Sequence, residues 1–160
     1  MAARRAMSAA ARAPYIHANA LVLGDKGVLL RGPSGSGKSA LTLALISRYQ
    51  SQGEFARLVG DDRVRVEALN GRLIARPHPA IAGMIEIRGH GLSRVETEAA
   101  CVLRAIVDIR TPDDPPSRLP DAAEKSASLH AIALPRLCTE GCSDVSVARI
   151  IFFIQSIATI

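Results

Sequence analysis

The segment Gly32-Pro33-Ser34-Gly35-Ser36-Gly37-Lys38-Ser39 decides the fold of this chain. It matches the phosphate-loop pattern GxxxxGK[ST], in which a glycine-rich loop connects a strand to a helix. The apolar run 27–31 before it is typical of a strand, and the run 40–46 after it is typical of a helix. A chance Gly/Ser-rich turn that binds nothing would not need these flanks. We therefore expect the chain to bind a nucleotide.

Each residue type in the loop has a physical task. Glycines let the backbone wrap a phosphate chain and turn its N–H groups inward, and the helix N-terminus adds a favourable dipole. Lys38 is expected to reach the terminal phosphates, and the Ser39 hydroxyl is expected to take a Mg²⁺ position. The expected nucleotide-binding residues are the whole loop: Gly32, Pro33, Ser34, Gly35, Ser36, Gly37, Lys38 and Ser39.

Length and composition indicate one soluble domain. The 160 residues suffice for a single core, which we place at 14–160 after a loose Ala/Arg-rich tail at 1–13. The longest apolar runs are too short to span a membrane. No continuous apolar segment follows the basic N-terminus, so we expect no signal peptide. The three cysteines have no disulfide or metal spacing, so we expect reduced thiols and a cytoplasmic protein.

The positive net charge of +5 does not by itself indicate nucleic-acid binding. Aromatic residues make up only 3% of the chain, so few side chains are available for nucleic-acid bases to stack on, and the arginines are scattered. A basic protein attracts an acidic partner or a polyphosphate equally well. We therefore expect no nucleic-acid partner.

The pattern of apolar runs predicts a mixed α/β fold. Strands are expected over 16–23 and 27–31 as a hairpin, and around Asn70-Gly71 as a second hairpin. Further strands are expected over 101–109 and 129–134, a Pro-rich loop over 111–121, and a closing helix or strand over 145–157. The two hairpins argue for a mixed sheet and against a doubly wound parallel one.

Two acidic positions are candidates for chemistry. Asp61-Asp62 ends a short apolar run, and such residues beside a phosphate loop order Mg²⁺ or a nucleophile. Adjacent carboxylates on an extended chain point in opposite directions and so divide these tasks, although the pair also suits a simple Asx-turn. Glu86 lies in an apolar strand, where a carboxylate either meets a cation or faces solvent.

Taken alone, the remaining candidates have ordinary explanations. His17 suits a surface or hydrogen-bonded core histidine, and Arg118 suits a solvated loop or a phosphate clamp. His78 and His130 are expected to have structural or solvent roles, and His90 has no assigned role.

The combination of these segments resembles the C-terminal catalytic domain of HPr kinase/phosphorylase. The resemblance rests on 16–20 (Ile-His-Ala-Asn-Ala), the phosphate loop, 58–62 (Leu-Val-Gly-Asp-Asp) and 86–91 (Glu-Ile-Arg-Gly-His-Gly). It covers about 14–110 well. It implies a P-loop kinase domain similar to the nucleotide domain of phosphoenolpyruvate carboxykinase. It also implies transfer of phosphate from Mg·ATP to a serine of the phosphocarrier protein HPr, and its removal by inorganic phosphate.

The resemblance also implies roles for individual residues. Asp62 is similar to the family's general base, Lys38 to its catalytic lysine, and Ser39 and Glu86 to its Mg²⁺ ligands. His17 has the spacing of the active-site histidine, and Arg118 has the context of a catalytic arginine. The family implies a homo-oligomer that regulates the phosphotransferase system.

Three departures from the family pattern stand out. Full-length members of the family carry an N-terminal domain, whereas we expect this chain to be the catalytic half alone, and His90 stands where leucine is usual. The Pro-x-Arg-Pro-Gly-Arg segment tied to phosphorolysis is replaced by 134–137 (Leu-Pro-Arg-Leu). Two other functions stay open: a non-catalytic ATP- or phosphate-sensing module, and a small-molecule kinase. The paired Asp62 and Glu86 favour an enzyme over a sensor.

Lys38→Ala is expected to remove phosphate transfer and to weaken nucleotide binding strongly. The backbone N–H groups of the loop remain, but the mobile positive charge is lost. Transfer of labelled phosphate to HPr and nucleotide affinity measure the two effects. A variant that phosphorylates HPr at close to the wild-type rate contradicts the phosphate-loop interpretation.

Overall fold

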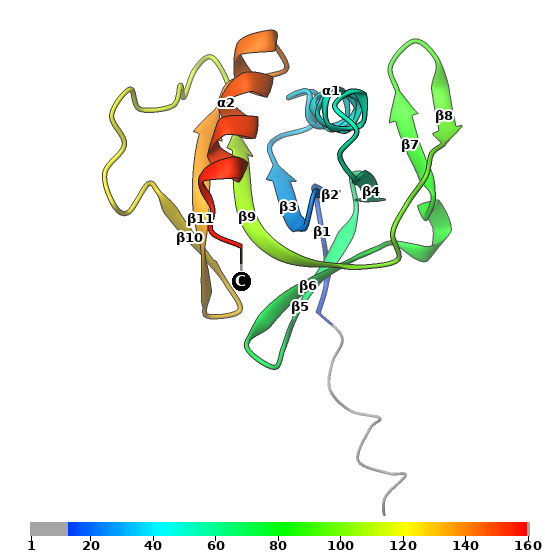
Figure 1. Ribbon diagram of the computed structural model, residues 1–160, viewed down its shortest axis with the longest axis horizontal. Coiled ribbons are helices and arrows are strands. Elements are labelled where there is room, and N and C mark those ends of the chain that lie inside the picture. Colours follow the sequence, from blue (N-terminus) through cyan, green and yellow to red (C-terminus); the bar gives the residue numbers. More distant parts are fainter. Residues whose placement is uncertain (1–12, 160) are drawn as a thin grey trace, which may run out of the picture.

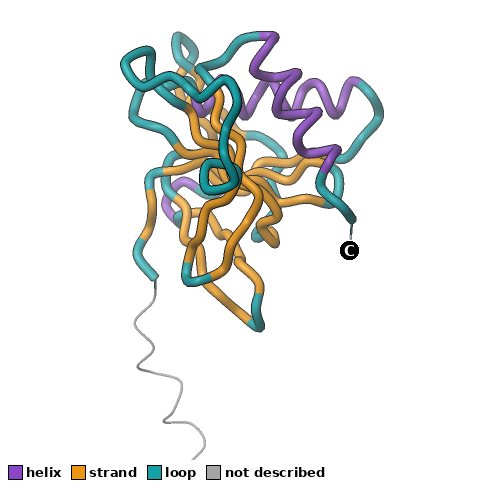
Figure 2. The backbone as a smooth tube through the Cα atoms, turned by 90° about the vertical axis from the view of Figure 1, so that its left-hand side faces the viewer, coloured by secondary structure: helices purple, strands orange, loops and turns teal. Residues whose placement is uncertain are grey.

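The structure is a computed structural model that describes residues 13–159, so all but the last residue of the expected tail 1–13 lies outside it (Figure 1). A curled mixed sheet carries both α-helices on one side (Figures 1 and 2). The strands are β1 (Tyr15–Ile16), β2 (Ala18–Leu23), β3 (Lys26–Arg31), β4 (Ala56–Gly60), β5 (Val64–Leu69), β6 (Arg72–Pro77), β7 (Met84–Ile87), β8 (Gly91–Arg94), β9 (Cys101–Ile109), β10 (Ser126–Leu129) and β11 (Ile132–Thr139). The helices are α1 (Lys38–Ser51), the short 3₁₀ helix η1 (Pro79–Ile81) and α2 (Asp144–Ser156).

The long strand β9 organises the sheet. It pairs in parallel with β3 on one edge, while its other edge pairs antiparallel with β6 and then in parallel with β11. The main strand order is β1-β5-β6-β9-β3-β2-β4, and β10 joins through β11. Parallel and antiparallel neighbours occur together, so the predicted mixed sheet is confirmed.

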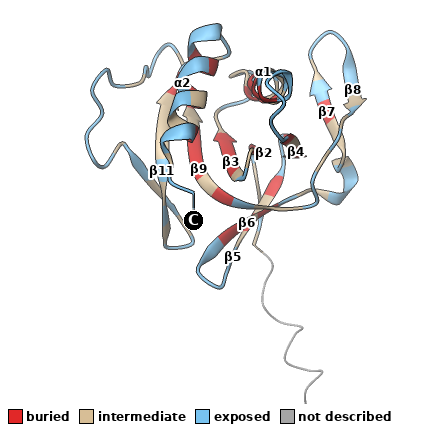
Figure 3. Cartoon of the chain, viewed as in Figure 1, coloured by how far each residue is buried: buried red, intermediate tan, exposed pale blue. Residues whose placement is uncertain are grey.

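Apolar residues fill both sides of the curled sheet. One cluster lies between the sheet and the helices, with Leu41 and Leu45 of α1 and Ile150 of α2 fully buried. The second cluster lies on the opposite side and includes Leu29, Leu73 and Ile106. Figure 3 shows buried stretches in β3 and β9, and most residues of β2 and β4 are buried as well. Burying both faces explains why β9 reads as a nearly continuous apolar run.

The two predicted hairpins are present. β2 and β3 pair antiparallel, and β5 pairs with β6 around Asn70-Gly71. Asn70 and Gly71 have φ angles of 51° and 74°, the left-handed values that a two-residue hairpin turn requires. The expected strand over 101–109 is confirmed as β9.

The expected strand over 129–134 is wrong, because the chain reverses in its middle. His130 and Ala131 have φ angles of 46° and 61° and form the turn between β10 and β11. Neither residue is Gly or Asn, so the sequence carries no ordinary turn signal here. The His130 ring helps to hold this turn in place, because its Nε2 lies 2.8 Å from the carbonyl oxygen of Val66 in β5.

The C-terminal segment settles as helix α2 rather than a strand. Its first turn has a capping box, in which the Ser143 hydroxyl accepts from the Ser146 N–H, and Ser146 Oγ in turn accepts from the Ser143 N–H. The expected loop over 111–121 contains no helix or strand. Within residues 13–159, neither helix is long and apolar enough to cross a membrane.

Candidate active site

The phosphate loop connects β3 to α1 as the sequence predicted. Gly37 stands at the N-cap of α1 with φ 97°, and Gly35 has φ 78°, both in the region that side-chain-bearing residues rarely adopt. Lys38 begins the helix, and its ammonium group folds back on the loop. The Lys38 Nζ donates to the carbonyl oxygens of Gly32 at 2.9 Å and Pro33 at 3.2 Å.

His17 connects the lysine to Asp62. The residue lies in the bend between β1 and β2, with its Nε2 3.1 Å from Lys38 Nζ and its Nδ1 2.9 Å from Asp62 Oδ1. A lysine ammonium has only donors, so Nε2 must accept and the ring proton lies on Nδ1. This assignment from the hydrogen-bond network makes His17 neutral, donating to Asp62. Three residues that the sequence suggested separately are therefore joined by hydrogen bonds in one row, Lys38–His17–Asp62.

Burial lowers the pKa of the Lys38 ammonium from its ordinary value, while the charges of Asp62 and Asp61 act in the opposite direction. Only 6% of the Lys38 residue is exposed. The two carboxylates thus offset part of the cost of holding a cation inside the loop.

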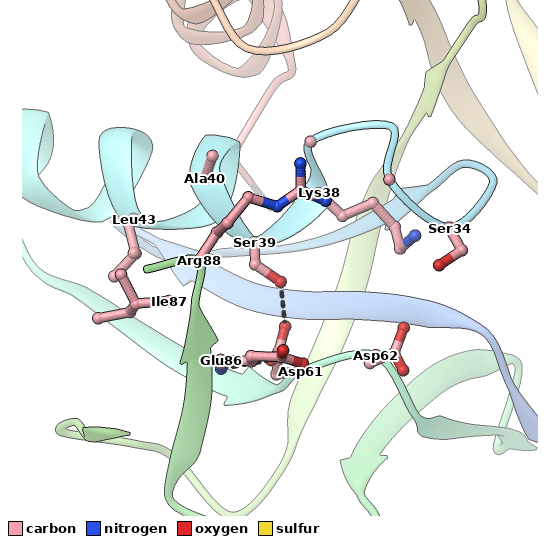
Figure 4. A pocket seen from close by; sticks show the side chains of 12 residues that line it. Ser34, Lys38, Ser39, Ala40, Leu43, Asp61, Asp62, Glu86, Ile87 and Arg88 are labelled. Atoms are coloured by element: carbon pink, nitrogen blue, oxygen red, sulfur yellow. Dashed lines mark hydrogen bonds between the residues drawn. The ribbon is translucent and has the colours of Figure 1, made fainter. Parts of the chain in front are cut away.

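Asp61 is buried and accepts three hydrogen bonds. Its Oδ1 accepts from the Ser39 hydroxyl at 2.7 Å and from the Asn19 amide at 2.9 Å. Its Oδ2 accepts from the backbone N–H of Glu86 at 2.9 Å. A dashed line in Figure 4 marks the contact between Ser39 and Asp61. A buried carboxylate needs such donors, and here they join the phosphate-loop helix, β2 and β7 at one point.

Asp62 has a different environment from its neighbour. Its side chain is 54% exposed and pairs with His17. The expectation that the two carboxylates diverge because the chain is extended is wrong. Asp62 has φ 62°, and the Arg63 N–H donates to the Asp61 carbonyl oxygen at 2.7 Å, which closes a tight turn around it. The carboxylates point apart because of this turn, and not because of strand alternation.

A cavity of about 420 Å³ lies between the phosphate loop and β7 (Figure 4). Lys38, Ser39, both aspartates and Glu86 line it, as does Arg88. Glu86 lies beside Asp61, and Arg88 extends from the end of β7 toward the start of α1. Sequence reasoning gave Arg88 no role, although it lies within the Glu-Ile-Arg-Gly segment.

The polar groups of this cavity fit a magnesium ion bound together with phosphates. The Ser39 hydroxyl and the carboxylates of Asp61 and Glu86 are oxygen donors, the ligand type that Mg²⁺ prefers. Among the described residues there is no group of three or more His, Cys, Asp and Glu side chains placed to hold a metal. Mg²⁺ commonly binds through one or two carboxylates and substrate phosphates, so a small protein ligand set suits it.

Other sequence candidates lie away from this cavity. Arg118 belongs to the loop between β9 and β10 and does not line it. His78 caps η1, its Nδ1 accepting from the Ala80 N–H, and its ring packs on Tyr15. His90 is exposed at the β7–β8 turn. The cysteines are free thiols, as expected, and burial raises the pKa of Cys101 to about 12.

Comparison with known proteins identifies the class. The family model described as the HPr Serine kinase C-terminal domain matches residues 8–100, more than half of the chain. The chain therefore belongs to the HPr serine kinase C-terminal domain family.

Particular relatives agree with this assignment. The HPr kinase/phosphorylase of Clostridium tetani is 36% identical over 85 residues, which cover 53% of this chain and 25% of that protein. The HPr kinase/phosphorylase of Clostridium beijerinckii is 42% identical over 71 residues, covering 44% and 22%. The matches thus span about a quarter or less of the length of these curated relatives.

A solved structure extends the similarity to most of the chain. The Hpr(Ser) kinase/phosphatase from Coxiella burnetii superposes with a TM-score of 0.73 and 25% sequence identity. The match covers 88% of this chain and 93% of that one. The predicted P-loop kinase fold is thereby confirmed, including the region beyond residue 100.

The two aspartates are expected to differ in their effect on folding stability. Asp61→Asn places an amide N–H₂ among donors and leaves buried N–H or O–H groups unpaired, which costs about 1–3 kcal/mol. Asp62→Asn changes an exposed group and is expected to leave the urea midpoint nearly unchanged. Urea denaturation of both variants measures the difference. A larger loss from Asp62→Asn contradicts this description of the pair.

Proposed function

We propose that this chain is a Mg·ATP-dependent serine kinase that phosphorylates an HPr-like phosphocarrier protein and so regulates a phosphotransferase system. The observation that carries the proposal is the hydrogen-bonded row Lys38–His17–Asp62 beside the phosphate loop. His17 lies 3.1 Å from the Lys38 ammonium and 2.9 Å from the Asp62 carboxylate. Phosphoryl transfer needs a positioned phosphate, a cationic contact and a group that orients the nucleophile. These parts lie together here.

Lys38 and the loop bind the phosphates in this proposal. The loop N–H groups and the α1 N-terminus hold the phosphate chain, and Lys38 contacts the terminal phosphoryl group. To do so, the ammonium exchanges a bond to Gly32 O or Pro33 O for a phosphate oxygen. His17 keeps its Nε2 acceptor toward Lys38, which directs the ammonium during this exchange.

Asp62 is proposed as the general base. Its exposed carboxylate is accessible to the hydroxyl of a protein substrate, whereas Asp61 is only 5% exposed. The seryl oxygen attacks the γ-phosphorus, its proton passes to Asp62, and the bond to the ADP oxygen breaks. The His17 Nδ1–H donates to Asp62 and holds the carboxylate in position.

Ser39 and Glu86 are proposed to hold the Mg²⁺, with Asp61 fixing the Ser39 hydroxyl. When bound, the ion supplies positive charge to the phosphate oxygens. Arg118 stays a predicted phosphate clamp, although it does not line the cavity.

The alternatives receive less support. A nucleotide sensor binds phosphate without needing His17 between the lysine and an exposed carboxylate. A small-molecule kinase uses the same loop, but the matched relatives carry the name HPr kinase/phosphorylase. We further propose that the chain works as a homo-oligomer in the cytoplasm, with ATP and inorganic phosphate as its other ligands, on the strength of family resemblance.

Asp62→Asn is expected to lower the rate of transfer to HPr by about two to four decades, because the amide keeps the shape but loses the proton acceptor. Binding of Mg·ATP is expected to stay close to wild type. Labelled ATP with HPr that has or lacks its target serine provides the assay. Asp61→Asn, compared per folded molecule, is expected to cost less. If Asp61→Asn is the more damaging change, the base is assigned to the wrong aspartate.

Phosphorolysis is expected to be much slower than the forward reaction. The reverse reaction needs a cationic grip on phosphoseryl HPr, and Arg136 is the one arginine at 134–137. Its Nε donates to the Glu124 carbonyl oxygen, and its Nη1 lies 3.4 Å from Asp108, which also pairs with Arg31. These contacts support a structural role for Arg136.

The test incubates phosphoseryl HPr with Mg²⁺ and millimolar phosphate and measures pyrophosphate release. Release far slower than forward transfer is the expected result. Pyrophosphate produced as fast as the forward reaction would show that the loop and Arg118 suffice for the reverse reaction.

A further inference from the structure

Asn19 is a polar residue inside an otherwise apolar strand. It lies in β2, whose other residues are Ala, Leu and Val, and it is completely buried. A buried amide is unfavourable unless its donors and acceptor are all paired. The position therefore needs an explanation other than packing, since an apolar residue of similar size would fill the strand at less cost.

The side-chain amide of Asn19 contacts both aspartates. Its Nδ2 donates to Asp61 Oδ1 at 2.9 Å and to Thr42 Oγ1 at 3.1 Å, while its Oδ1 accepts from the Asp62 backbone N–H at 2.8 Å. Thr42 Oγ1 donates its own proton to the Lys38 carbonyl oxygen, so it can only accept from Asn19. Each group that contacts the amide can therefore act in only one way, either as a donor or as an acceptor.

These directions leave one orientation for the amide. If its oxygen and nitrogen were exchanged, the oxygen would face the Asp61 carboxylate and the N–H₂ would face the Asp62 N–H. Both contacts would be repulsive. An aspartate at this position would likewise place its carboxylate against that of Asp61. Asparagine supplies a donor on one side and an acceptor on the other.

The turn at Asp62 explains why the acceptor is needed. The bond from Arg63 N–H to Asp61 O, with φ 62° at the central residue, is the geometry of a strained γ-turn. Such backbone conformations persist only where surrounding contacts hold them, and they concentrate at functional sites. The Asp62 N–H points into the protein, where Asn19 Oδ1 is its acceptor.

We infer that Asn19 is a positioning residue that assigns the two adjacent aspartates to different tasks. Its amide N–H₂ fixes the Asp61 carboxylate facing Ser39. Its carbonyl oxygen holds the Asp62 backbone in the turn that presents the Asp62 carboxylate to His17 and to the substrate hydroxyl. The kinetic part of this inference rests on the proposed function, whereas the structural part does not.

The structural test measures hydrogen exchange of the Asp62 amide by NMR in the wild type and in Asn19→Leu. Leucine is close in size and removes all three hydrogen bonds. Protection of the Asp62 N–H is expected to fall at least about tenfold, because its acceptor is gone. The Gly24 N–H, which donates to Phe55 O at 2.7 Å beyond the far end of β2, is expected to keep its protection. Unchanged protection at Asp62 overturns the inference.

The kinetic test compares kcat and KM for HPr phosphorylation. Misplaced reacting groups cost up to about a hundredfold in rate, so Asn19→Leu is expected to lower kcat about tenfold to a hundredfold. The KM for ATP is expected to change less than about threefold, since the loop residues themselves are untouched. A kcat within about threefold of wild type overturns the inference.

A double variant separates positioning from general loss of structure. If Asn19 acts through Asp62, adding Asn19→Leu to Asp62→Asn is expected to cause little further loss in kcat. The same fall in both backgrounds overturns the inference that Asn19 positions Asp62. Val66→Ala, which opens the core at a buried position of β5 that makes no hydrogen bond to either aspartate through its side chain, is the control. It is expected to lower the melting temperature and to leave kcat unchanged.

A second substitution covers failure to fold. Asn19→Thr keeps one hydroxyl that can accept or donate, so it is expected to fold and to show intermediate exchange and kcat. Wild-type values for Asn19→Thr in both measurements overturn the inference. A wild-type protein that phosphorylates no HPr defeats the proposed function, and exchange at Asp62 then decides the role of Asn19 separately.

Discussion

The rest of the site depends on one buried carboxylate. Asp61 lies at the end of β4 and accepts from Ser39 on α1, Asn19 on β2 and the Glu86 N–H on β7. A buried anion with fewer donors would be costly, so each of these elements is held where its donor reaches Asp61. The β7–β8 hairpin forms a sheet of its own. The Glu86 N–H contact therefore gives this separate hairpin a defined place against the phosphate loop.

The strand–loop–helix unit, the Asn70-Gly71 hairpin and the strand 101–109 could be predicted because their signals are local. Periodicity and turn chemistry act over a few residues, and the chain follows them there. The turn at His130-Ala131 could not be predicted, since it uses left-handed backbone without Gly or Asn. The candidate site was predicted as a set of separate residues. Its connections were not, because Asn19 and Asp61 lie 42 positions apart and meet only through the pairing of β2 with β4.

The end of the family match does not coincide with a boundary in the fold. The matched residues end at 100, yet β9 begins at Cys101 and forms the centre of the sheet against β3. The phosphate loop leaves the end of β3, so its placement depends on a strand outside the matched region. The similarity to the Coxiella burnetii structure covers 88% of the chain and includes this part. Sheet pairing requires only apolar residues with the right alternation, and many sequences satisfy it. The acidic pair and the phosphate loop tolerate far fewer substitutions, so the sequence similarity is concentrated there.

The ammonium of Lys38 has three hydrogens and three partners: Gly32 O, Pro33 O and His17 Nε2. These three hydrogen bonds tie the ammonium both to the loop and to the bend between β1 and β2, so the fold itself sets the position of the cation. In the proposed function, a phosphate oxygen replaces one of the two carbonyl oxygens as an acceptor. Binding is then an exchange of one hydrogen bond for a charge-assisted one, and the affinity depends on the difference in strength between the two.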